Sequence, residues 1–391
     1  MITRRTLLKV SALLSLSYYK SSISAMVNFH KPIEEISCND VESIKKLKLK
    51  DGMIIRTSGY YHAQDDGAMT YIVKKRLTSN DKYCIKINDH YYIIPLIKDF
   101  ISFKQLGLKM DGHHDNTDDL RKFLSISGKY FFNPGILIVK DYIELNSDIT
   151  IIGSGMQTSI IEYRNSKNNW LFINGEKGNL DFLEGNGYNG RGNIVLSKFS
   201  INLRGDIAEG SRSAMIFGRA KNILIDQVHF YNGKNSHRIE CNSQLNFTVR
   251  NCIFSNTVIS QDGSHEEINI DFNNHAGFPA YGNWDNTPCL NVNIVSCKFI
   301  NVQKGVASHS TPPKHHSNIN VIDCSFQNTT SHAIQFEGID NSTINNCHFL
   351  DSGESDISLI NSNKNNIINI KSNNKTTITS NKNSHGNNSI Y

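Results

Sequence analysis

The sequence lacks the short signatures of the commonest nucleotide and metal sites. It contains no phosphate-binding P-loop, no GxGxxG turn that opens a helix, no HExxH and no CxxC. Charge is also scarce, at 20% of residues, with a formal net charge of +5. The first 25 residues hold Arg4, Arg5, Lys9 and Lys20 and no acidic residue, so the rest of the chain is close to neutral. A neutral chain has no electrostatic footprint for nucleic acid, and we expect no nucleic-acid partner.

Hydrophobic residues make up 38% of the chain, which is too little for an integral membrane protein. We therefore expect no membrane span in the mature protein. The content of isoleucine and phenylalanine is too high for a disordered chain. At 391 residues the chain exceeds the size at which one globular core stops growing, so we expect either two domains or one elongated repeat structure.

Residues 1–25 have the pattern of an export signal. They start with basic residues, continue with a modest apolar run at 10–16 and end with small residues at 22–25. The stretch TRRTLLK at 3–9 resembles the twin-arginine pattern, which implies a bacterial protein exported in the folded state by the twin-arginine machinery. An ordinary secretory signal is the alternative. Either signal predicts a periplasmic, extracellular or cell-surface protein.

A strand-like pattern centred on a cysteine recurs in the second half of the chain. Cys252, Cys297, Cys324 and Cys347 each follow alternating apolar residues and precede a phenylalanine by two positions, with Asn or Asp two positions further on. Val228 takes the cysteine position in an earlier copy, and the steps are 24, 45, 27 and 23 residues. A period in the twenties with alternation inside each copy indicates the stacked strands of a solenoid. The cysteines are then buried hydrophobic residues rather than disulfides, and each Asn turns the coil.

Coils of this length, with an asparagine after each strand, resemble the right-handed parallel β-helix of the pectate-lyase-like superfamily. Residues 103–120, FKQLGLKMDGHHDNTDDL, look like that superfamily's opening motif of strand, Gly-Asp-Gly, Asp-Asp-Thr and capping helix, with Met110 in place of the first glycine. We expect Thr117 to cap a helix at 118–127. Its apolar face would cover the open end of the first coil, through Leu120, Phe123 and Leu124.

Residues 50–98 resemble the small β module that precedes the helix in phage tailspikes and related polysaccharide-degrading proteins. The resemblances together cover roughly residues 50–370. They predict an all-β chain in which a right-handed single-stranded parallel β-helix carries an N-terminal capping helix and a small N-terminal β module. We expect an export signal at 1–25, the β module at 26–100, the β-helix at 101–375 and a polar, disordered tail at 376–391.

The 45-residue step between Cys252 and Cys297 is longer than one coil by about twenty residues, a loop length that usually implies function. The excursion follows the strand pattern EINID at 267–271. Alternation turns the isoleucines inward and lines up Glu267, Asn269 and Asp271 on the outer face. Strands in neighbouring coils add Glu240, His309 and Glu337 to the same face.

Stacked carboxylates repel one another, so the pKa of one of them rises and the pair supplies both an acid and a base, as glycoside hydrolysis requires. Solvated coil charges are the alternative interpretation. Aromatic residues of the excursion offer an apolar platform for a sugar ring. The candidate catalytic residues are Asp271, Glu267, Glu240 and His309. The candidate substrate-binding residues are Trp284, Tyr281, Asp285, Asn269, His237 and Glu337. No tight ligand spacing is present, so we predict no metal site and no cofactor.

These residues predict an exported carbohydrate-active protein, first of all a glycoside hydrolase that cleaves an extracellular or capsular polysaccharide. One alternative is a polysaccharide lyase or uronate epimerase with His309 or an arginine as base. An acidic groove repels a uronate chain unless Ca²⁺ intervenes, which favours hydrolysis. Another alternative is a non-catalytic protein that binds or organises a polysaccharide. Both a monomer and a homotrimer are compatible with the resemblance.

Overall fold

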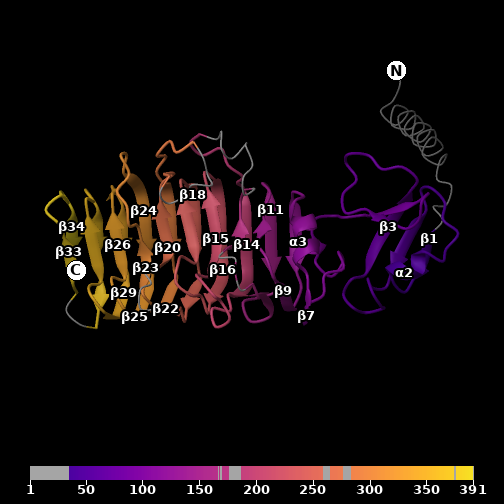
Figure 1. Ribbon diagram of the computed structural model, residues 1–391, viewed down its shortest axis with the longest axis horizontal. Helices are drawn as coiled ribbons and strands as arrows, with labels where there is room; N and C mark the ends of the chain where they lie inside the picture. Colours follow the sequence, from indigo (N-terminus) through magenta and orange to yellow (C-terminus); the bar gives the residue numbers. More distant parts are fainter. Residues whose placement is uncertain are drawn as a thin grey trace, which may run out of the picture. The chain divides into compact units, whose positions relative to one another are not determined.

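The computed structural model describes residues 35–165, 167, 170–175, 186–258, 265–275, 283–373 and 376–390. The expected export signal at 1–25 and the candidate Tyr281 lie outside these residues. The chain divides into two compact units, Met1–Leu96 and Ile97–Tyr391. The sequence pattern places this boundary between residues 100 and 101. Figure 1 shows the strands and helices of both.

The described part of the first unit is a small β module. Its sheet has the order β1-β2-β3-β5-β4, with β1 and β2 parallel and the other pairs antiparallel. The elements are β1 (Glu35–Cys38), α2 (Val41–Ile44), β2 (Ile54–Thr57), β3 (Met69–Lys74), β4 (Ile85–Lys86) and β5 (Tyr92–Pro95). On β3, Met69, Tyr71 and Val73 are buried and alternate with partly exposed residues, which is the period expected of a half-buried strand. Asp40 caps α2 by accepting a hydrogen bond from the backbone N–H of Ser43 at 2.7 Å.

The second unit is a right-handed parallel β-helix, as predicted. In the described residues it comprises a nine-stranded and a twenty-stranded sheet in which every pairing is parallel, and the strands stack coil upon coil (Figure 1). The nine-stranded sheet contains β10 (Ile143–Glu144), β13 (Trp170–Ile173), β15 (Ser213–Gly218), β17 (Ile239–Asn242), β20 (Glu266–Asp271), β23 (Lys304–Ala307), β26 (Ile334–Glu337), β30 (Ile357–Ile360) and β33 (Ile378–Ser380).

The twenty-stranded sheet supplies the other sides of the coils. Its strands are β6 (Ile101–Ser102), β7 (Asp111–Asp115), β8 (Gly128–Phe132), β9 (Gly135–Val139), β11 (Ile149–Gly153), β12 (Ser159–Tyr163), β14 (Ile194–Asn202), β16 (Lys221–Tyr231), β18 (Leu245–Arg250), β19 (Ile253–Ser255), β21 (Leu290–Val295), β22 (Lys298–Val302), β24 (His316–Ile322), β25 (Ser325–Thr329), β27 (Ile339–Asp340), β28 (Thr343–Asn345), β29 (His348–Ser352), β31 (Asn366–Ile368), β32 (Lys371–Ser372) and β34 (Asn388–Ile390).

The capping helix α3 spans Thr117–Leu124 and buries Leu120, Phe123 and Leu124, as the sequence pattern predicts. The prediction that Thr117 is its cap is wrong. The N-cap is Asn116, and the Thr117 hydroxyl donates to Asp115 at 2.6 Å while accepting from the backbone N–H of Lys140. The hydroxyl therefore braces the helix against neighbouring loops and does not cap it. No helix in the described part of the chain is long and apolar enough to cross a membrane.

Phenylalanines form a continuous stack inside the coils. The ring centroids of Phe299 and Phe326 are 4.8 Å apart, those of Phe254 and Phe299 are 4.9 Å apart, and those of Phe326 and Phe349 are 5.1 Å apart. The planes of these rings are within 11° of parallel. These separations match the strand spacing of about 4.8 Å, so identical residues stack in register from coil to coil.

The predicted cysteine and asparagine ladders are confirmed. All eight cysteines are free thiols, and the four in the repeat are buried, as small hydrophobic residues are. Asn256, Asn301 and Asn328 have φ values of 56°, 54° and 52°, in the left-handed region that asparagine tolerates. The side-chain amide of Asn328 donates to Asn301 at 2.9 Å, and that of Asn301 donates to Asn256 at 3.2 Å.

The expectation of a disordered tail at 376–391 is wrong for its described part. Strand β33 pairs with β30, and β34 pairs with β31, so this segment adds a further coil. The amide of Asn388 donates to Asn366 at 3.3 Å, which continues an asparagine ladder. A polar composition predicts disorder when a segment must bury its own core, whereas here the preceding coil supplies most of the backbone hydrogen bonds.

Candidate functional site

The candidate residues lie on three neighbouring strands of the nine-stranded sheet, β17, β20 and β23. The parallel register pairs Glu240 with Asn269 and Asn242 with Asp271. Ile268 and Ile270 are fully buried in the core. Glu240, Asn269 and Asp271 therefore share the outer side of the sheet, as alternation predicts.

The carboxylates expected to line an open groove are covered. Glu240, Glu267 and Asp271 are only 1%, 0% and 3% exposed, and Asn269 is also buried. The alternative interpretation as solvated charges is excluded because these side chains are buried. A buried carboxylate requires a partner or a proton.

Glu267 does not face a substrate groove. Its Oε2 lies 3.4 Å from Nε of the buried Arg238, and its Oε1 accepts a hydrogen bond from the Thr257 hydroxyl. The Arg238 guanidinium also donates to the backbone carbonyls of Asn235 and Ser236. Burial raises the pKa of Glu267, and the opposite charge of Arg238 works against that rise. Glu267 therefore balances an internal arginine, and its assignment as a catalytic residue is corrected.

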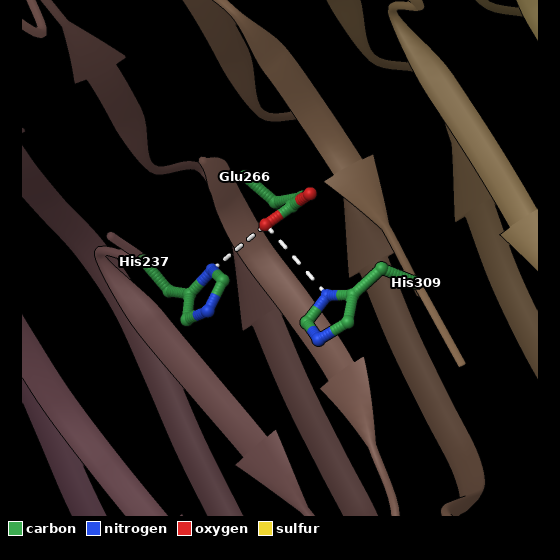
Figure 2. A group of neighbouring side chains, drawn as sticks. All are labelled: His237, Glu266 and His309. Atoms are coloured by element: carbon green, nitrogen blue, oxygen red, sulfur yellow. Dashed lines mark ion pairs between the residues drawn. The ribbon is translucent and has the colours of Figure 1, made fainter. Parts of the chain in front are cut away.

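Glu266, which is not among the residues that strand alternation selects, is at the centre of the site (Figure 2). Its Oε2 lies 2.9 Å from Nδ1 of His237 and 3.9 Å from Nδ1 of His309. Its Oε1 lies 3.3 Å from Nζ of Lys304. Burial on its own would raise the pKa of Glu266, but His237, Lys304 and His309 lower it to about 2. The one signal in the sequence that points to Glu266 is Lys304, a basic residue that lies opposite Glu266 in the register of the next coil.

The two histidines flank Glu266 with nearly parallel rings, whose centroids are 5.7 Å apart at 16°. Nε2 of His237 lies 3.5 Å from Oε2 of Glu240, and Nε2 of His309 lies 3.9 Å from Oδ2 of Asp271. Burial would lower the pKa of His237, but Glu240 and Glu266 raise it. The side chain of His309 is 44% exposed, so His309 is the member of the cluster that reaches the surface.

Glu240 has the raised pKa that the sequence analysis expects of one carboxyl in the stack. Burial raises the pKa of Glu240 to about 8, and the charges of Asp271 and Glu266 add to this effect while His237 opposes it. The main cause is therefore burial rather than repulsion between carboxylates. Oε2 of Glu240 accepts a hydrogen bond from the side-chain amide of Asn269 at 3.0 Å.

Asp271 ends β20 at the point where the excursion begins. Its Oδ1 accepts hydrogen bonds from the backbone N–H of Phe272 at 2.7 Å and from the Ser310 hydroxyl at 2.9 Å. Its Oδ2 is the oxygen that faces His309. The carboxylate is thus fixed in orientation beside the exposed imidazole.

The remaining candidates do not join the cluster. Asp285 accepts from the backbone N–H of Gly187 at 2.7 Å and pairs with Arg219 at 3.2 Å, so it anchors the excursion, and its contact with substrate stays a prediction. Glu337 accepts a hydrogen bond from the Thr311 hydroxyl. Trp284 is 41% exposed and meets His275 edge-on, with centroids 4.4 Å apart, which leaves an aromatic surface for a ligand.

No protein-family model matches the chain, and no curated protein matches its sequence. Among solved structures, PfbA, a surface adhesin of Streptococcus pneumoniae, is similar with a TM-score of 0.63 and 18% identity over 74% of this chain and 79% of that one. The gp42 tailspike of Acinetobacter phage vb_AbaP_AS12 is similar with a TM-score of 0.54 and 11% identity. The similarity covers 91% of this chain and 75% of that one.

Pantoea stewartii WceF, described as a glycan biofilm modifying enzyme with a tailspike-like parallel β-helix, has a TM-score of 0.52 and 11% identity. The likeness covers 90% of this chain and 49% of that one. Identities this low bear on the fold and leave the activity open. The chain has the parallel β-helix fold of these adhesin, tailspike and glycan-modifying proteins.

Proposed function

We propose that this chain is an exported carbohydrate-active protein that holds a polysaccharide over β17, β20 and β23 and cleaves it at Asp271. The observation that carries the proposal is the placement of Asp271. Its carboxylate is fixed by Phe272 and Ser310, it faces the exposed His309, and the excursion with the exposed Trp284 starts directly after it. The similarity of fold to a glycan biofilm modifying enzyme supports a carbohydrate ligand.

Hydrolysis is the first reaction we propose for this site. It requires a second carboxyl group near the scissile bond. Glu240 is the candidate for this role because it lies on the adjacent strand, on the same side of the sheet, and is oriented by the amide of Asn269. In this reaction Asp271 and Glu240 flank the scissile bond, one protonating the leaving oxygen and the other acting as nucleophile or activating water.

Elimination or epimerisation of a uronate chain is the second candidate, and burial of the acids favours it. The carboxylates are almost fully covered, whereas the side chains of His309, His237 and Lys304 are 44%, 18% and 13% exposed. The surface of the site is therefore not acidic, and it does not repel an acidic polysaccharide. Asp271 is then the base that removes the C5 proton, and a uronate substrate brings Ca²⁺ into consideration.

Product analysis tests the proposal. Mature protein is incubated with the capsular or exopolysaccharide of its host, beside the variants Asp271→Asn and Asp323→Asn. Asp323 is the matched control because it lies in a coil turn, where it accepts a hydrogen bond from Asn346. We expect Asp271→Asn to lower product release by at least about 100-fold and Asp323→Asn to leave it unchanged.

The products identify the reaction. New reducing ends without absorbance near 235 nm indicate hydrolysis, and absorbance there indicates elimination. Binding without any product contradicts catalysis and indicates a protein that binds or organises polysaccharide, a role that the fold similarity to a surface adhesin also allows. Equal products from wild type and Asp271→Asn contradict the proposed site.

Export is proposed from the sequence of residues 1–25, with the periplasm or the cell surface as destination. Expression of the full chain with Arg4→Lys and Arg5→Lys, followed by cell fractionation, tests the twin-arginine route. Retention of the double variant in the cytoplasm supports that route, and normal export of the variant indicates the general secretory route.

A further inference from the structure

We propose that His237, Glu266 and His309 bind a divalent first-row transition-metal ion, with Zn²⁺ as the probe that represents this class. The proposal goes beyond the function proposed above, because the ion binds whichever reaction the site performs. It also differs from the sequence analysis, which predicts no metal site.

Three ligand atoms from three successive coils converge at one point (Figure 2). His237, Glu266 and His309 each offer one ligand atom, and these three atoms lie within 4.8 Å of one another. Nδ1 of His237 is 2.9 Å from Oε2, and Nδ1 of His309 is 3.9 Å from it. Two imidazoles and one carboxylate on one side of an ion leave further positions open for water or substrate.

The spacing suits a small transition-metal ion. Metal–nitrogen and metal–oxygen distances of about 2.0–2.2 Å place neighbouring ligand atoms roughly 3.0–3.5 Å apart. The His237 and Glu266 atoms are already near this separation. Nδ1 of His309 has to approach Oε2 of Glu266 by about half an ångström, and the two histidine ligand atoms, which lie within 4.8 Å of each other, have to approach by up to about 1.5 Å. The side chain of His309 is 44% exposed, so this movement meets little packing resistance.

The outer nitrogens of both histidines provide an independent indication. Nε2 of His237 lies 3.5 Å from Glu240, and Nε2 of His309 lies 3.9 Å from Asp271. Histidines that bind metal usually direct their other N–H towards a carboxylate, which fixes the tautomer and the ring orientation. Each histidine here has Nδ1 on the shared Glu266 and Nε2 on a carboxylate of its own. Release of the Nδ1 proton from each ring on binding makes the Nδ1 lone pair available for an ion.

The inner nitrogen of His237 is the third observation. It is buried and, among the described residues, makes no hydrogen bond, although Oε2 of Glu266 is close. Its lone pair is therefore directed beside that oxygen, where an ion would sit. Lys304 contacts the other oxygen, Oε1, and leaves Oε2 for the ion. The competing arrangement, in which Lys304 and a proton are the only cations at Glu266, is an outcome of the test.

The donor set defines the class of metal. Imidazole nitrogen suits Zn²⁺, Fe²⁺, Ni²⁺ and Cu²⁺, whereas Ca²⁺ prefers six to eight oxygen ligands. The proposed site is therefore distinct from any Ca²⁺ bound by a uronate substrate. Calcium serves as the negative probe in the experiment.

Calorimetric titration of chelator-treated mature protein with Zn²⁺ and with Ca²⁺ tests the site. We expect one Zn²⁺ per chain, no binding of Ca²⁺, and a loss of Zn²⁺ affinity of more than about 100-fold in His309→Ala. Asp271→Asn should weaken binding by about 10–100-fold, because Asp271 only orients His309. Circular dichroism establishes that each variant is folded.

His332→Ala is the matched control. His332 also pairs with a glutamate, Glu354, at 3.1 Å, and its side chain is 20% exposed, close to the 18% of His237. Among the described residues, no second histidine forms an ion pair with Glu354. All these proteins carry the same eight cysteines, so metal bound by thiols is common to them. The control should bind Zn²⁺ as the wild type does.

Electron paramagnetic resonance of the Cu²⁺-loaded protein counts the imidazole ligands. We expect nitrogen hyperfine structure from two imidazoles in the wild type and from one in His309→Ala. Absence of Zn²⁺ binding, or identical affinity and spectra in wild type and His309→Ala, overturns the proposal. These readouts do not depend on turnover, so loss of the metal site and loss of the proposed cleavage are distinguished.

Discussion

Nδ1 of His237 lies 2.9 Å from Oε2 of Glu266, although the two residues belong to successive coils of the β-helix. Glu266 is 2% exposed, and its other oxygen faces Lys304. The carboxylate is thus buried between basic groups from the coil before and the coil after it. Its charge holds neighbouring coils together at the site.

Glu266→Gln should destabilise the protein strongly. The substitution leaves His237 and Lys304 without their buried counter-charge, and breaking such a pair costs about 3–5 kcal/mol. The matched control is Glu354→Gln, because Glu354 also pairs with a histidine but its side chain is 60% exposed. An exposed pair contributes less than about 1 kcal/mol. Urea unfolding of both variants measures the difference, and equal losses would contradict the interpretation.

Phe326→Ala should open a cavity in the phenylalanine stack. Phe326 is fully buried between Phe299 and Phe349, with centroid separations of 4.8 and 5.1 Å. Truncation of a buried phenylalanine costs about 3–5 kcal/mol. Gln327→Ala, an exposed position on the same strand, should change the free energy of unfolding by less than about 0.5 kcal/mol. Similar unfolding midpoints for the two variants would show that the stack does not support the fold.

Acidification should destabilise the protein through His316. Burial lowers the pKa of His316 from 6.5 to about 3, and nearby His315 adds to this effect. Its Nδ1 accepts a hydrogen bond from the backbone N–H of Cys289 at 2.9 Å, which requires an unprotonated nitrogen. The unfolded chain binds the proton more readily. The stability due to neutral His316 is therefore complete above about pH 6.5 and falls as the pH drops towards 3.

The measurement compares urea unfolding at pH 7.5 and pH 5.0 for wild type and His316→Gln. Gln retains an acceptor but does not titrate. We expect the loss of stability on acidification to be smaller in the variant by up to about 2 kcal/mol, from about 1.4 kcal/mol per pH unit below 6.5. Other titrating groups are common to both proteins and cancel. An identical loss in both proteins would show that His316 is not responsible.

The repeat was predictable because strand periodicity is a local property. Residues two apart share a face, so Cys297 and Phe299 both point inward, as do the equivalent residues of the other coils. This follows from the sequence pattern alone. The turn at Asn301 follows from the tolerance of asparagine for positive φ. These patterns are sufficient to predict a parallel β-helix and its internal ladders.

The tail and the helix cap were mispredicted for related reasons. Composition alone predicts disorder at 376–391, but β33 and β34 obtain backbone partners from the preceding coil. Thr117 has the chemistry of a cap, yet its hydroxyl is engaged by Asp115 and Lys140. In both cases a partner distant in sequence determines the local structure.

The sequence by itself determined the coil, its core ladders and the strand on which Asp271 lies. Only the tertiary structure decided which carboxylates are charged, buried and paired. Alternation assigns a side chain to a face but contains no information on what covers it. Glu267 is engaged by Arg238, and Glu266 is engaged by His237 and Lys304, all from neighbouring coils. Electrostatic energies depend on distances between such neighbours, and stacking of the coils sets those distances.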